Sequence, residues 1–401
     1  MIHFDPYMLA RWQLARDREA TRRFPGLFER KLARMVASPF AFLRGSARLY
    51  YEVLRQQPEL AEGPDGEGQL IGDLHLENFG AYRPAAFDGG GAVEHDATFG
   101  LNDFDDATIG PWRFDLLRLA TSLILAGREL GARGSEGLVM VEGLLDAWNR
   151  HAHAPKTLRP PPVPPSVVAL VEQVRARPRQ ALLDARTTVT KGRRCFVRGP
   201  RYRNLPARLV RQVPEAMERY LESLDVAVRP PAERLRVLDA AFRVAGIGSL
   251  GVLRIAVLVT GKGGSDGGWV FDLKEQGQPS SHQLLTPPRR NGAKRVRDAL
   301  CSCLAQPPKM VGVTRLDERP MLVRRLTPQD DKLDLGRVDH RELPSLARYL
   351  GALVGEAHRR GAIRQGKPWR ADEQRSLLER AVGLAGLHEA TSLALCDLSR
   401  R

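Results

Sequence analysis

Apolar residues in the first part of the chain recur at the spacing of an α-helix. Between residues 8 and 56, side chains such as Leu27, Leu32 and Met35 would fall on one face of a helix. Ser38-Pro39 interrupts this pattern, because proline disrupts a helix interior. The sequence therefore predicts helices over most of this segment, with a break near residue 38.

Two proline-containing segments punctuate the next part of the chain. Gly110-Pro111 precedes an apolar helical segment from Trp112 to about Ala126, and proline is tolerated in a first turn because its missing N–H costs little there. The run Arg159–Ser166 contains five prolines and fits neither a helix nor a central strand. It predicts a stiff connector that marks a boundary in the chain.

The pattern changes from helical to β-like after residue 243. Helical spacing continues to about Arg229 and, beyond a break at Pro230-Pro231, to roughly Arg243. Val252–Thr260 is then rich in β-branched residues, and Trp269–Lys274 alternates, which together predict a hairpin around a Gly-rich turn at residues 261–268. The other predicted elements are a hairpin tip at Phe87–Gly91, a helix over residues 292–304, a strand over Pro320–Leu326 and helices from Leu343 onward.

Length and composition predict a globular protein larger than one ordinary domain. The chain has 401 residues, of which 43% are hydrophobic, enough to bury the core of a two-lobed protein. Its net charge of +15 points toward polyanionic partners, such as nucleotides, nucleic acid or phosphorylated substrates. The basic residues are spread along the chain, however, which favours a solvated basic surface over a dedicated nucleic-acid face.

Cysteine usage and hydropathy favour a cytoplasmic protein without a membrane partner. The four cysteines do not form a paired framework, and the pair Cys301 and Cys303 lacks the second half of a zinc ligand set. The N-terminus opens into charged residues without an apolar signal segment. The longest apolar run, Leu116–Ala126, contains Arg118 and is too short to span a bilayer.

The segment Gly72-Asp73-Leu74-His75-Leu76-Glu77-Asn78 is the first candidate for chemistry. It is expected on a loop after a short strand, with Asp73 and Asn78 five residues apart. Phosphoryl transfer needs a carboxylate that positions the attacking hydroxyl, and Mg²⁺ prefers hard oxygen ligands. Asp73 and Asn78 would supply these groups, although such residues also stabilise ordinary turns.

The acidic segment Asn102-Asp103-Phe104-Asp105-Asp106 is the second candidate. Several neighbouring carboxylates repel each other unless a cation neutralises them, so metal binding by Asp103 is reasonable. A solvated acidic loop is the alternative. Asp115 would then lie in the first turn of the following helix, where a negative charge is favourable.

The third candidate is Gly246-Ile247-Gly248-Ser249-Leu250-Gly251, which leads into the predicted hairpin. Glycines let backbone N–H groups approach phosphate oxygens, and a lysine on the neighbouring strand can neutralise phosphate charge. Lys274 lies on the face opposite Trp269, Phe271 and Leu273, so it could face a cleft. A dinucleotide-binding motif would open a helix, whereas this one precedes a strand.

These motifs together resemble a bacterial family known as domain of unknown function 2252. The resemblance covers nearly the whole chain and rests on Lys31–Gly45, residues 72–80, 102–120, 246–251 and 273–275. That family is similar to the protein-kinase-like superfamily, especially the aminoglycoside phosphotransferases and related small-molecule kinases. Their catalytic loop, H-G-D-x-H-x-x-N, resembles the segment from Gly72 to Asn78, and their metal-binding Ile-Asp-Phe/Trp resembles Asn102-Asp103-Phe104.

Carried over residue by residue, the resemblance implies a complete nucleotide site. It implies Asp73 as catalytic base, with His75 in the same catalytic loop, and Lys274 as the partner of the nucleotide phosphates. The implied Mg²⁺ ligands are Asn78, Asp103 and Asp105, and the implied loop over the triphosphate contains Gly246, Gly248, Ser249 and Gly251. The helix after Lys274 offers Asp298 where a kinase has its ion-pairing Glu.

The expected fold is α+β and two-lobed, like a protein kinase, with a mostly helical larger lobe and a small antiparallel β lobe. The catalytic loop precedes the glycine loop, so the lobes are expected in circularly permuted order. The predicted parts are residues 1–150 with the catalytic loop and metal site, 151–240 as connector and helices, 241–335 as the nucleotide lobe, and 336–401 as helices that return to the larger lobe.

The expected function is an ATP- and Mg²⁺-dependent phosphotransferase that acts on a hydroxyl of a small molecule or protein. Adenylyl transfer in the same cleft is an alternative, because a reversed nucleotide would use the same residues. A catalytically silent nucleotide-binding scaffold and a basic nucleic-acid binder are alternatives from another class; nucleic acid is not favoured.

Overall fold

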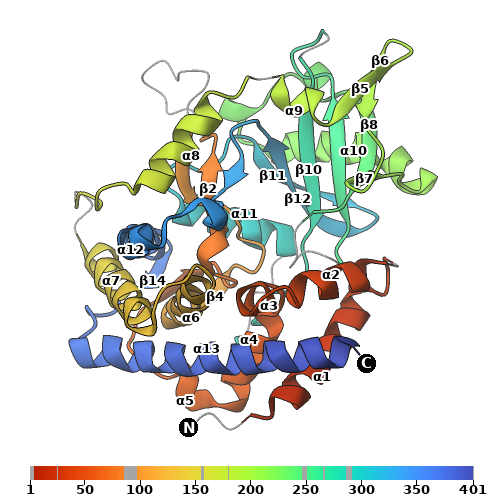
Figure 1. Cartoon of the computed structure of the whole chain (residues 1–401). Helices are drawn as coiled ribbons and strands as arrows, with labels where there is room; N and C mark the ends of the chain where they lie inside the picture. Colours follow the sequence, from red (N-terminus) through yellow and green to blue (C-terminus); the bar gives the residue numbers. More distant parts are fainter. Residues whose placement is uncertain are drawn as a thin grey trace.

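The computed structural model of the chain describes residues 4–24, 26–84, 97–154, 158–178, 180–245, 251–264, 267–285 and 291–400. It is a mixed α+β structure whose sheets are antiparallel. A largely helical body contains both ends of the chain, and a β-rich part contains the middle of the chain (Figure 1). In the described part of the chain, every helix falls short of what a membrane span requires.

The β-rich part is built on a six-stranded sheet with the order β11-β12-β10-β9-β8-β7. Helix α10 packs along this sheet, and α11 follows β10 in the chain and contacts β12. The bounds of these elements are β7 Tyr202–Arg203, β8 Val237–Arg243, β9 Arg254–Val259, β10 Trp269–Glu275, β11 Val311–Leu316, β12 Arg319–Leu326, α10 Ala207–Ser223 and α11 Gly292–Cys303.

The two faces of β10 differ as the alternation predicted. Trp269, Phe271 and Leu273 share an apolar core with residues of α10, whereas Val270 packs in a separate cluster on the other face. The predicted hairpin is present, because β10 pairs with β9 along its length. Lys274 therefore lies on the face opposite the α10 core.

Two segments predicted as helical are strands. β8 replaces the helix expected up to Arg243, because it pairs with β9 and packs Ala240 and Ala241 into apolar clusters on opposite faces, which outweighs the helix propensity of its leucine and alanines. Residues 187–196 form a separate hairpin, β5 (Thr187–Thr190) and β6 (Arg193–Phe196). The proline-rich run leads into α8 (Pro165–Arg175), and a short helix, α9 (Ala181–Asp184), precedes β5.

The helical body combines segments from both ends of the chain. The region from 8 to 56 contains four helices, and Ser38 caps the third of them, which confirms the predicted break there. The bounds are α1 Pro6–Thr21, α2 Leu27–Met35, α3 Pro39–Gly45, α4 Ala47–Gln56, α5 Pro58–Ala61, α6 Arg113–Glu129, α7 Gly134–His153, α12 Leu343–Arg360 and α13 Ala371–Arg400.

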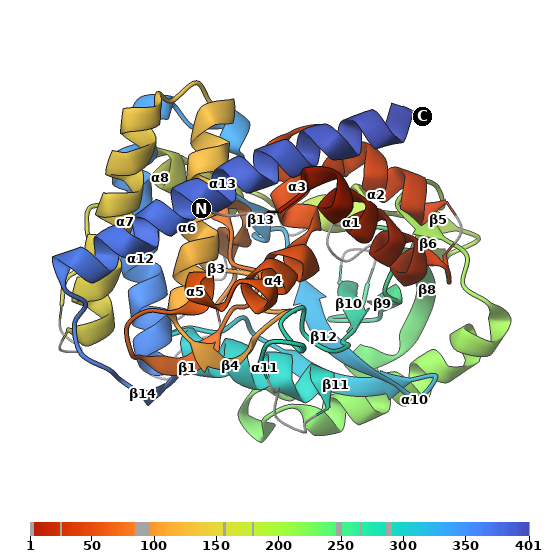
Figure 2. The ribbon, with the colours of Figure 1, turned by 90° about the horizontal axis from the view of Figure 1, so that it is seen from below.

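Helix α13 crosses this body and contacts α6, α3 and α1 (Figure 2). Two small sheets complete the body, with the orders β14-β1-β4 and β13-β2-β3. Their strands are β1 Glu67–Leu70, β2 Phe79–Tyr82, β3 Thr98–Leu101, β4 Thr108–Pro111, β13 Asp331–Lys332 and β14 Ala362–Arg364. The hairpin tip predicted at Phe87–Gly91 lies outside the described residues.

Helices α7 and α12 approach each other closely through two glycines. A Cβ on Gly351 would collide with the carbonyl oxygen of Leu144, and one on Gly355 would lie 2.7 Å from the carbonyl oxygen of Trp148. Both glycines lie one turn apart on the same face of α12. This contact fixes α12, which carries His358, against the rest of the body.

We expect Gly351→Ala to lower the free energy of unfolding by about 1–3 kcal/mol, because the added methyl group overpacks the contact with α7. Gly386→Ala on α13 is the matched control, since a Cβ there would meet no atom within 4 Å. The control should be neutral or stabilising by up to about 1 kcal/mol, because alanine favours helix. Thermal and denaturant unfolding measure both effects, and a Gly351→Ala variant as stable as the control would contradict the packing argument.

Candidate active site

The Asp73 loop and the acidic loop touch at Gly72. Gly72 follows β1 and has a φ of 86°, in the left-handed region that glycine adopts without strain. A Cβ at this position would also collide with the carbonyl oxygen of Asp106. Only glycine therefore fits here, and it brings the two acidic segments together.

The carboxylate of Asp115 holds the backbone that leads into Asp73. It is fully buried at the start of α6 and accepts hydrogen bonds from the backbone N–H groups of Ile71 (2.7 Å) and Gly72 (2.9 Å). It also lies 3.2 Å from Nε2 of His358, on α12. These hydrogen bonds orient the loop.

The carboxylate of Asp73 is held by Arg118, which lies on helix α6. The Nε of Arg118 donates to Asp73 Oδ1 at 2.7 Å, and its Nη2 donates to the carbonyl oxygen of Leu43. Arg118 is fully buried, whereas about 20% of the Asp73 side chain remains exposed. Burial raises the pKa of Asp73 to about 7, although the charge of Arg118 opposes the shift.

His75 and Asn78 stabilise the turn that follows Asp73. The His75 N–H donates to Asn78 Oδ1 at 2.8 Å, and the Glu77 N–H donates to His75 Nδ1 at 3.2 Å. Burial lowers the pKa of His75 well below its ordinary value, so the ring is neutral with its proton on Nε2. The oxygen of Asn78 keeps one lone pair for a second partner.

The acidic segment meets the six-stranded sheet at Lys274. Lys274 Nζ forms an ion pair with Asp105 Oδ2, and Asp105 Oδ1 accepts a hydrogen bond from Gln276 at 2.8 Å. Although burial opposes the shift, the charge of Lys274, followed by those of Lys332 and Arg254, holds the pKa of Asp103 below its ordinary value. Burial lowers the pKa of Lys274, and the charge of Asp103 opposes that shift.

Helix α11 contributes an arginine to the acidic segment. Arg295 donates to the backbone oxygens of Asp105 (3.0 Å), Ala107 and Gly277 (3.2 Å). Asp298, at the position where a kinase has its ion-pairing Glu, forms an ion pair with Arg297 at 2.7 Å. The described contacts therefore tie α11 to the loop backbone through a cation.

The described part of the predicted glycine loop lies against the N-terminal helices. Gly251 has a φ of 114°, and a Cβ there would lie 2.6 Å from the carbonyl oxygen of Ala20 in α1. Gly246, Gly248 and Ser249 lie outside the described residues. Of the four predicted loop residues, Gly251 is the one that the structure describes.

Arg118 is the site residue that sequence reasoning missed, since it entered only as an interruption of an apolar run. An arginine within a buried apolar helix needs a partner, and that requirement was the signal that could have identified it. Asp272, on the same face of β10 as Lys274, is a second buried charge whose partners the spacing did not identify. Burial opposes ionisation of its carboxyl, but Arg243 and Arg254 hold its pKa below the ordinary value.

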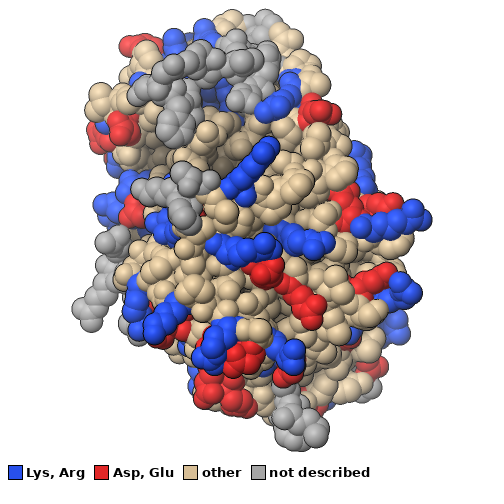
Figure 3. Space-filling model, turned by 90° about the vertical axis from the view of Figure 1, so that its left-hand side faces the viewer, with Lys and Arg blue, Asp and Glu red and all other residues tan. Residues whose placement is uncertain are grey.

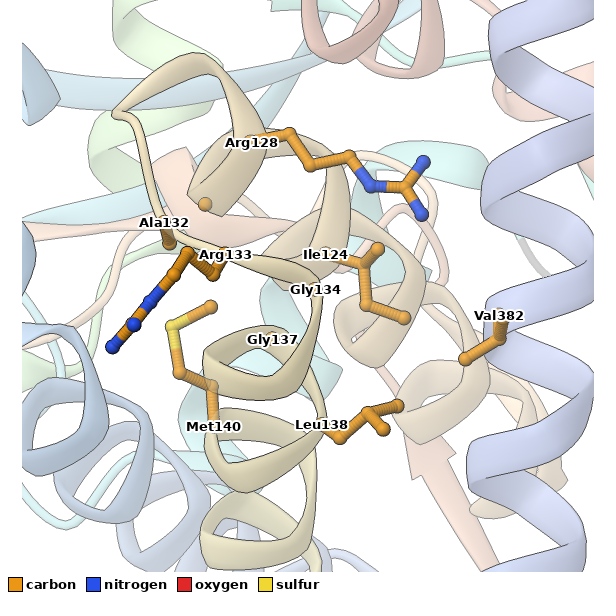
Figure 4. A pocket seen from close by; sticks show the side chains of 10 residues that line it. Ile124, Arg128, Ala132, Arg133, Gly134, Gly137, Leu138, Met140 and Val382 are labelled. Atoms are coloured by element: carbon orange, nitrogen blue, oxygen red, sulfur yellow. The ribbon is translucent and has the colours of Figure 1, made fainter.

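No group of three or more His, Cys, Asp or Glu side chains among the described residues forms a ready metal centre. A cavity of 230 Å³ between α6, α7 and α13 contains none of the acidic residues above (Figure 4). Its lining is largely apolar and includes Ile124, Leu138 and Met140. The face in Figure 3 carries interspersed basic and acidic side chains, as a solvated surface does.

Residues 23–386 match the sequence model of a family described as an uncharacterized protein conserved in bacteria, DUF2252. The chain belongs to this family. This match confirms the resemblance drawn from the motifs, which lie within the matched range. No curated protein and no solved structure matches the chain.

We expect Arg118→Met to raise the pKa of Asp73 above about 7, because the charge that opposes the effect of burial is removed. Arg118→Lys keeps the positive charge, so the pKa of Asp73 should rise less in this variant than in Arg118→Met. Carboxyl NMR titration of aspartate-labelled protein measures the pKa of Asp73, and Arg128→Met, at the far end of α6, is the control. An unchanged Asp73 midpoint in a folded Arg118→Met variant would show that Arg118 does not control this carboxylate.

Proposed function

We propose that the chain is an ATP- and Mg²⁺-dependent phosphotransferase with a kinase-like site, acting on a hydroxyl group. The observation that carries the proposal is the contact between Lys274 and the acidic segment, next to the loop of Asp73. Kinases need these three parts close together: a lysine for the phosphates, acidic residues for the metal, and a carboxylate for the nucleophile.

The connectivity of the sheet supports the same proposal. β8 and β9 flank the segment with the predicted glycine loop, and β10, next to β9, carries Lys274. Helix α11 follows, and then the hairpin β11–β12, with β12 placed beside β10. Kinases likewise have their lysine on the third strand, after the glycine-rich loop, with a helix behind it. The acidic loops precede this unit in the chain, so the proposed arrangement is a circular permutation.

The donor groups fit a hydrated Mg²⁺ ion. Asp103 and Asp105 offer hard carboxylate oxygens, and Asn78 offers an amide oxygen with one lone pair left. Mg²⁺ keeps several waters and takes one or two carboxylates plus phosphate oxygens, so it does not need a preformed cage of three acids. When bound, the ion would neutralise phosphate charge. Nucleotide phosphates would compete with Asp105 for Lys274.

Asp73 has the properties of a general base. Its pKa of about 7 lies close to neutral pH, where a base is both available and strong enough to accept a proton. One-fifth of its side chain is exposed, so an acceptor hydroxyl can reach it. The proton of that hydroxyl would move to Asp73 as the hydroxyl oxygen bonds to the γ-phosphorus of ATP, and the bond from that phosphorus to the bridging oxygen would break to release ADP. Arg118 keeps the carboxylate in one orientation during this step.

We expect Asp73→Asn to lower the turnover number by about 10³-fold and to leave nucleotide affinity nearly unchanged, because the amide cannot accept the proton. Asp103→Ala should instead weaken Mg²⁺-dependent ATP binding, measured as a smaller thermal shift with ATP and Mg²⁺. Asp146→Asn, an exposed position on α7, is the matched control for loss of a carboxylate.

Full activity in both variants would refute the proposed mechanism. Mass spectrometry of the products separates the possible reactions, since phosphoryl transfer adds one phosphate and adenylyl transfer adds AMP to the acceptor. An ATP-dependent thermal shift without any product would indicate a binding scaffold instead.

The pH dependence follows from the raised pKa of Asp73. The base must be unprotonated, so kcat/KM should rise between pH 6 and 8 with a midpoint near 7 and fall about tenfold per unit on the acid side. Arg118→Lys should move this midpoint less than Arg118→Met does. A profile that is flat from pH 6 to 8 would exclude Asp73 as the base that limits the rate.

A further inference from the structure

A two-stranded β-ribbon projects from the β-rich part, away from the proposed active site. β5 and β6 pair with each other in a sheet of their own, next to the six-stranded sheet. Figure 1 shows the ribbon extending beyond the other strands at the top right, and Figure 2 shows it at the edge of the molecule. A two-stranded ribbon is only marginally stable in water, so this one depends on its base.

The base of the ribbon is firmly attached to the sheet. The Phe196 ring stacks on Tyr202 with centroids 4.7 Å apart, and the Phe196 N–H donates to Asp239 at 2.8 Å. At the other strand, the Thr187 hydroxyl donates to the carbonyl oxygen of Leu183 at 2.6 Å. Both strands are therefore held at one end, and the other end projects into solvent.

The tip of the ribbon carries a lysine in an unfavourable conformation. Lys191 has a φ of 50° and Gly192 a φ of 74°, between the paired residues Thr190 and Arg193. Two positive φ values in a two-residue loop define a type I′ turn, in which Asn-Gly is favoured. A lysine here costs conformational energy, and such strain is often retained where the side chain has a function.

The segment that contains the ribbon carries only positive charges. Residues 186–203 contain seven Lys or Arg and no Asp or Glu. Lys191, Arg193 and Arg201 are exposed, and none of them forms an ion pair with a described acidic residue. Arg198 is paired, with Asp239. On the ribbon itself, the turn places Lys191 beside Arg193, and Arg194 follows on β6.

We propose that the β5–β6 ribbon is a binding surface for double-stranded DNA. The major groove of B-DNA admits a two-stranded ribbon, and the exposed basic side chains would contact the phosphates on either side. Thr188 and Thr190 add hydroxyl donors on the strand opposite Arg193. The proposal does not depend on the phosphotransferase activity, because the ribbon and the Asp73 loop share no residue.

The composition of the ribbon favours duplex DNA over other polyanions. Single-stranded nucleic acids are bound by stacking on exposed aromatic rings, whereas Phe196 and Tyr202 are buried at the base. The major groove of A-form RNA is too narrow for side chains to read. A membrane surface would call for interfacial Trp or Tyr side chains, and the tip residues include neither.

Fluorescence anisotropy of a labelled 20-base-pair duplex, measured with the full chain over a range of salt concentrations, tests the proposal. We expect Lys191→Glu with Arg193→Glu to weaken binding at least tenfold at low salt and to reduce the slope of log K against log salt by about 1.8, for two lost phosphate contacts. Lys367→Glu with Arg375→Glu is the control, because both residues are exposed, lie elsewhere and change the net charge equally.

Lys191→Asn separates binding from folding. Asparagine suits the type I′ turn, so this variant should keep or raise the unfolding temperature while reducing the salt slope by about 0.9. An equal loss of affinity in the control pair, or unchanged binding by Lys191→Asn, would overturn the proposal. Tighter binding of single-stranded RNA, or of vesicles containing anionic lipid, than of the duplex would also overturn it.

Discussion

The buried carboxylate of Asp115 is the interaction on which the candidate site depends. Trp148 Nε1 donates to His358 Nδ1 at 3.0 Å, so the proton of the neutral imidazole lies on Nε2 and points to Asp115. Asp115 in turn accepts the N–H groups of Ile71 and Gly72. A chain of hydrogen bonds therefore runs from α7 through α12 and α6 to the loop that carries Asp73. Each member is buried, so the loss of any one would leave a polar group without a partner.

The second constraint is electrostatic and joins the sheet to the helical body. Asp103 and Asp105 are acidic groups of the body, while Lys274 and Arg254 are basic groups of the sheet. Each side lowers the cost of burying the other, because an isolated buried charge is far more expensive than a paired one. In the proposed phosphotransferase, the same acidic and basic side chains would hold the metal ion and the nucleotide phosphates. The charges that would bind the ligand are therefore also the charges that join the sheet to the body.

The sequence predicted the parts of the fold whose signal is local. The break at Ser38, the helix after Pro111 and the two faces of β10 follow from residue type and spacing alone, and the structure contains all three. β8 was mistaken for a helix, because only pairing with β9 identifies it as a strand. Arg118 was passed over because its partner, Asp73, lies 45 residues earlier in the chain. Contacts of this kind depend on how distant segments meet, which periodicity does not encode.

The distance along the chain between Asp115 and His358, 243 residues, also constrains how the protein can fold. During synthesis the Asp73 loop and the acidic segment emerge first, while the lysine and the histidine that neutralise or orient them come much later. Until those later parts are made, the acidic segment lacks Lys274 and the apolar helix α6 lacks the cover of α13. Contacts this non-local slow the folding of small proteins, and here the hydrogen-bond chain through Asp115 can close only after α12 has been made.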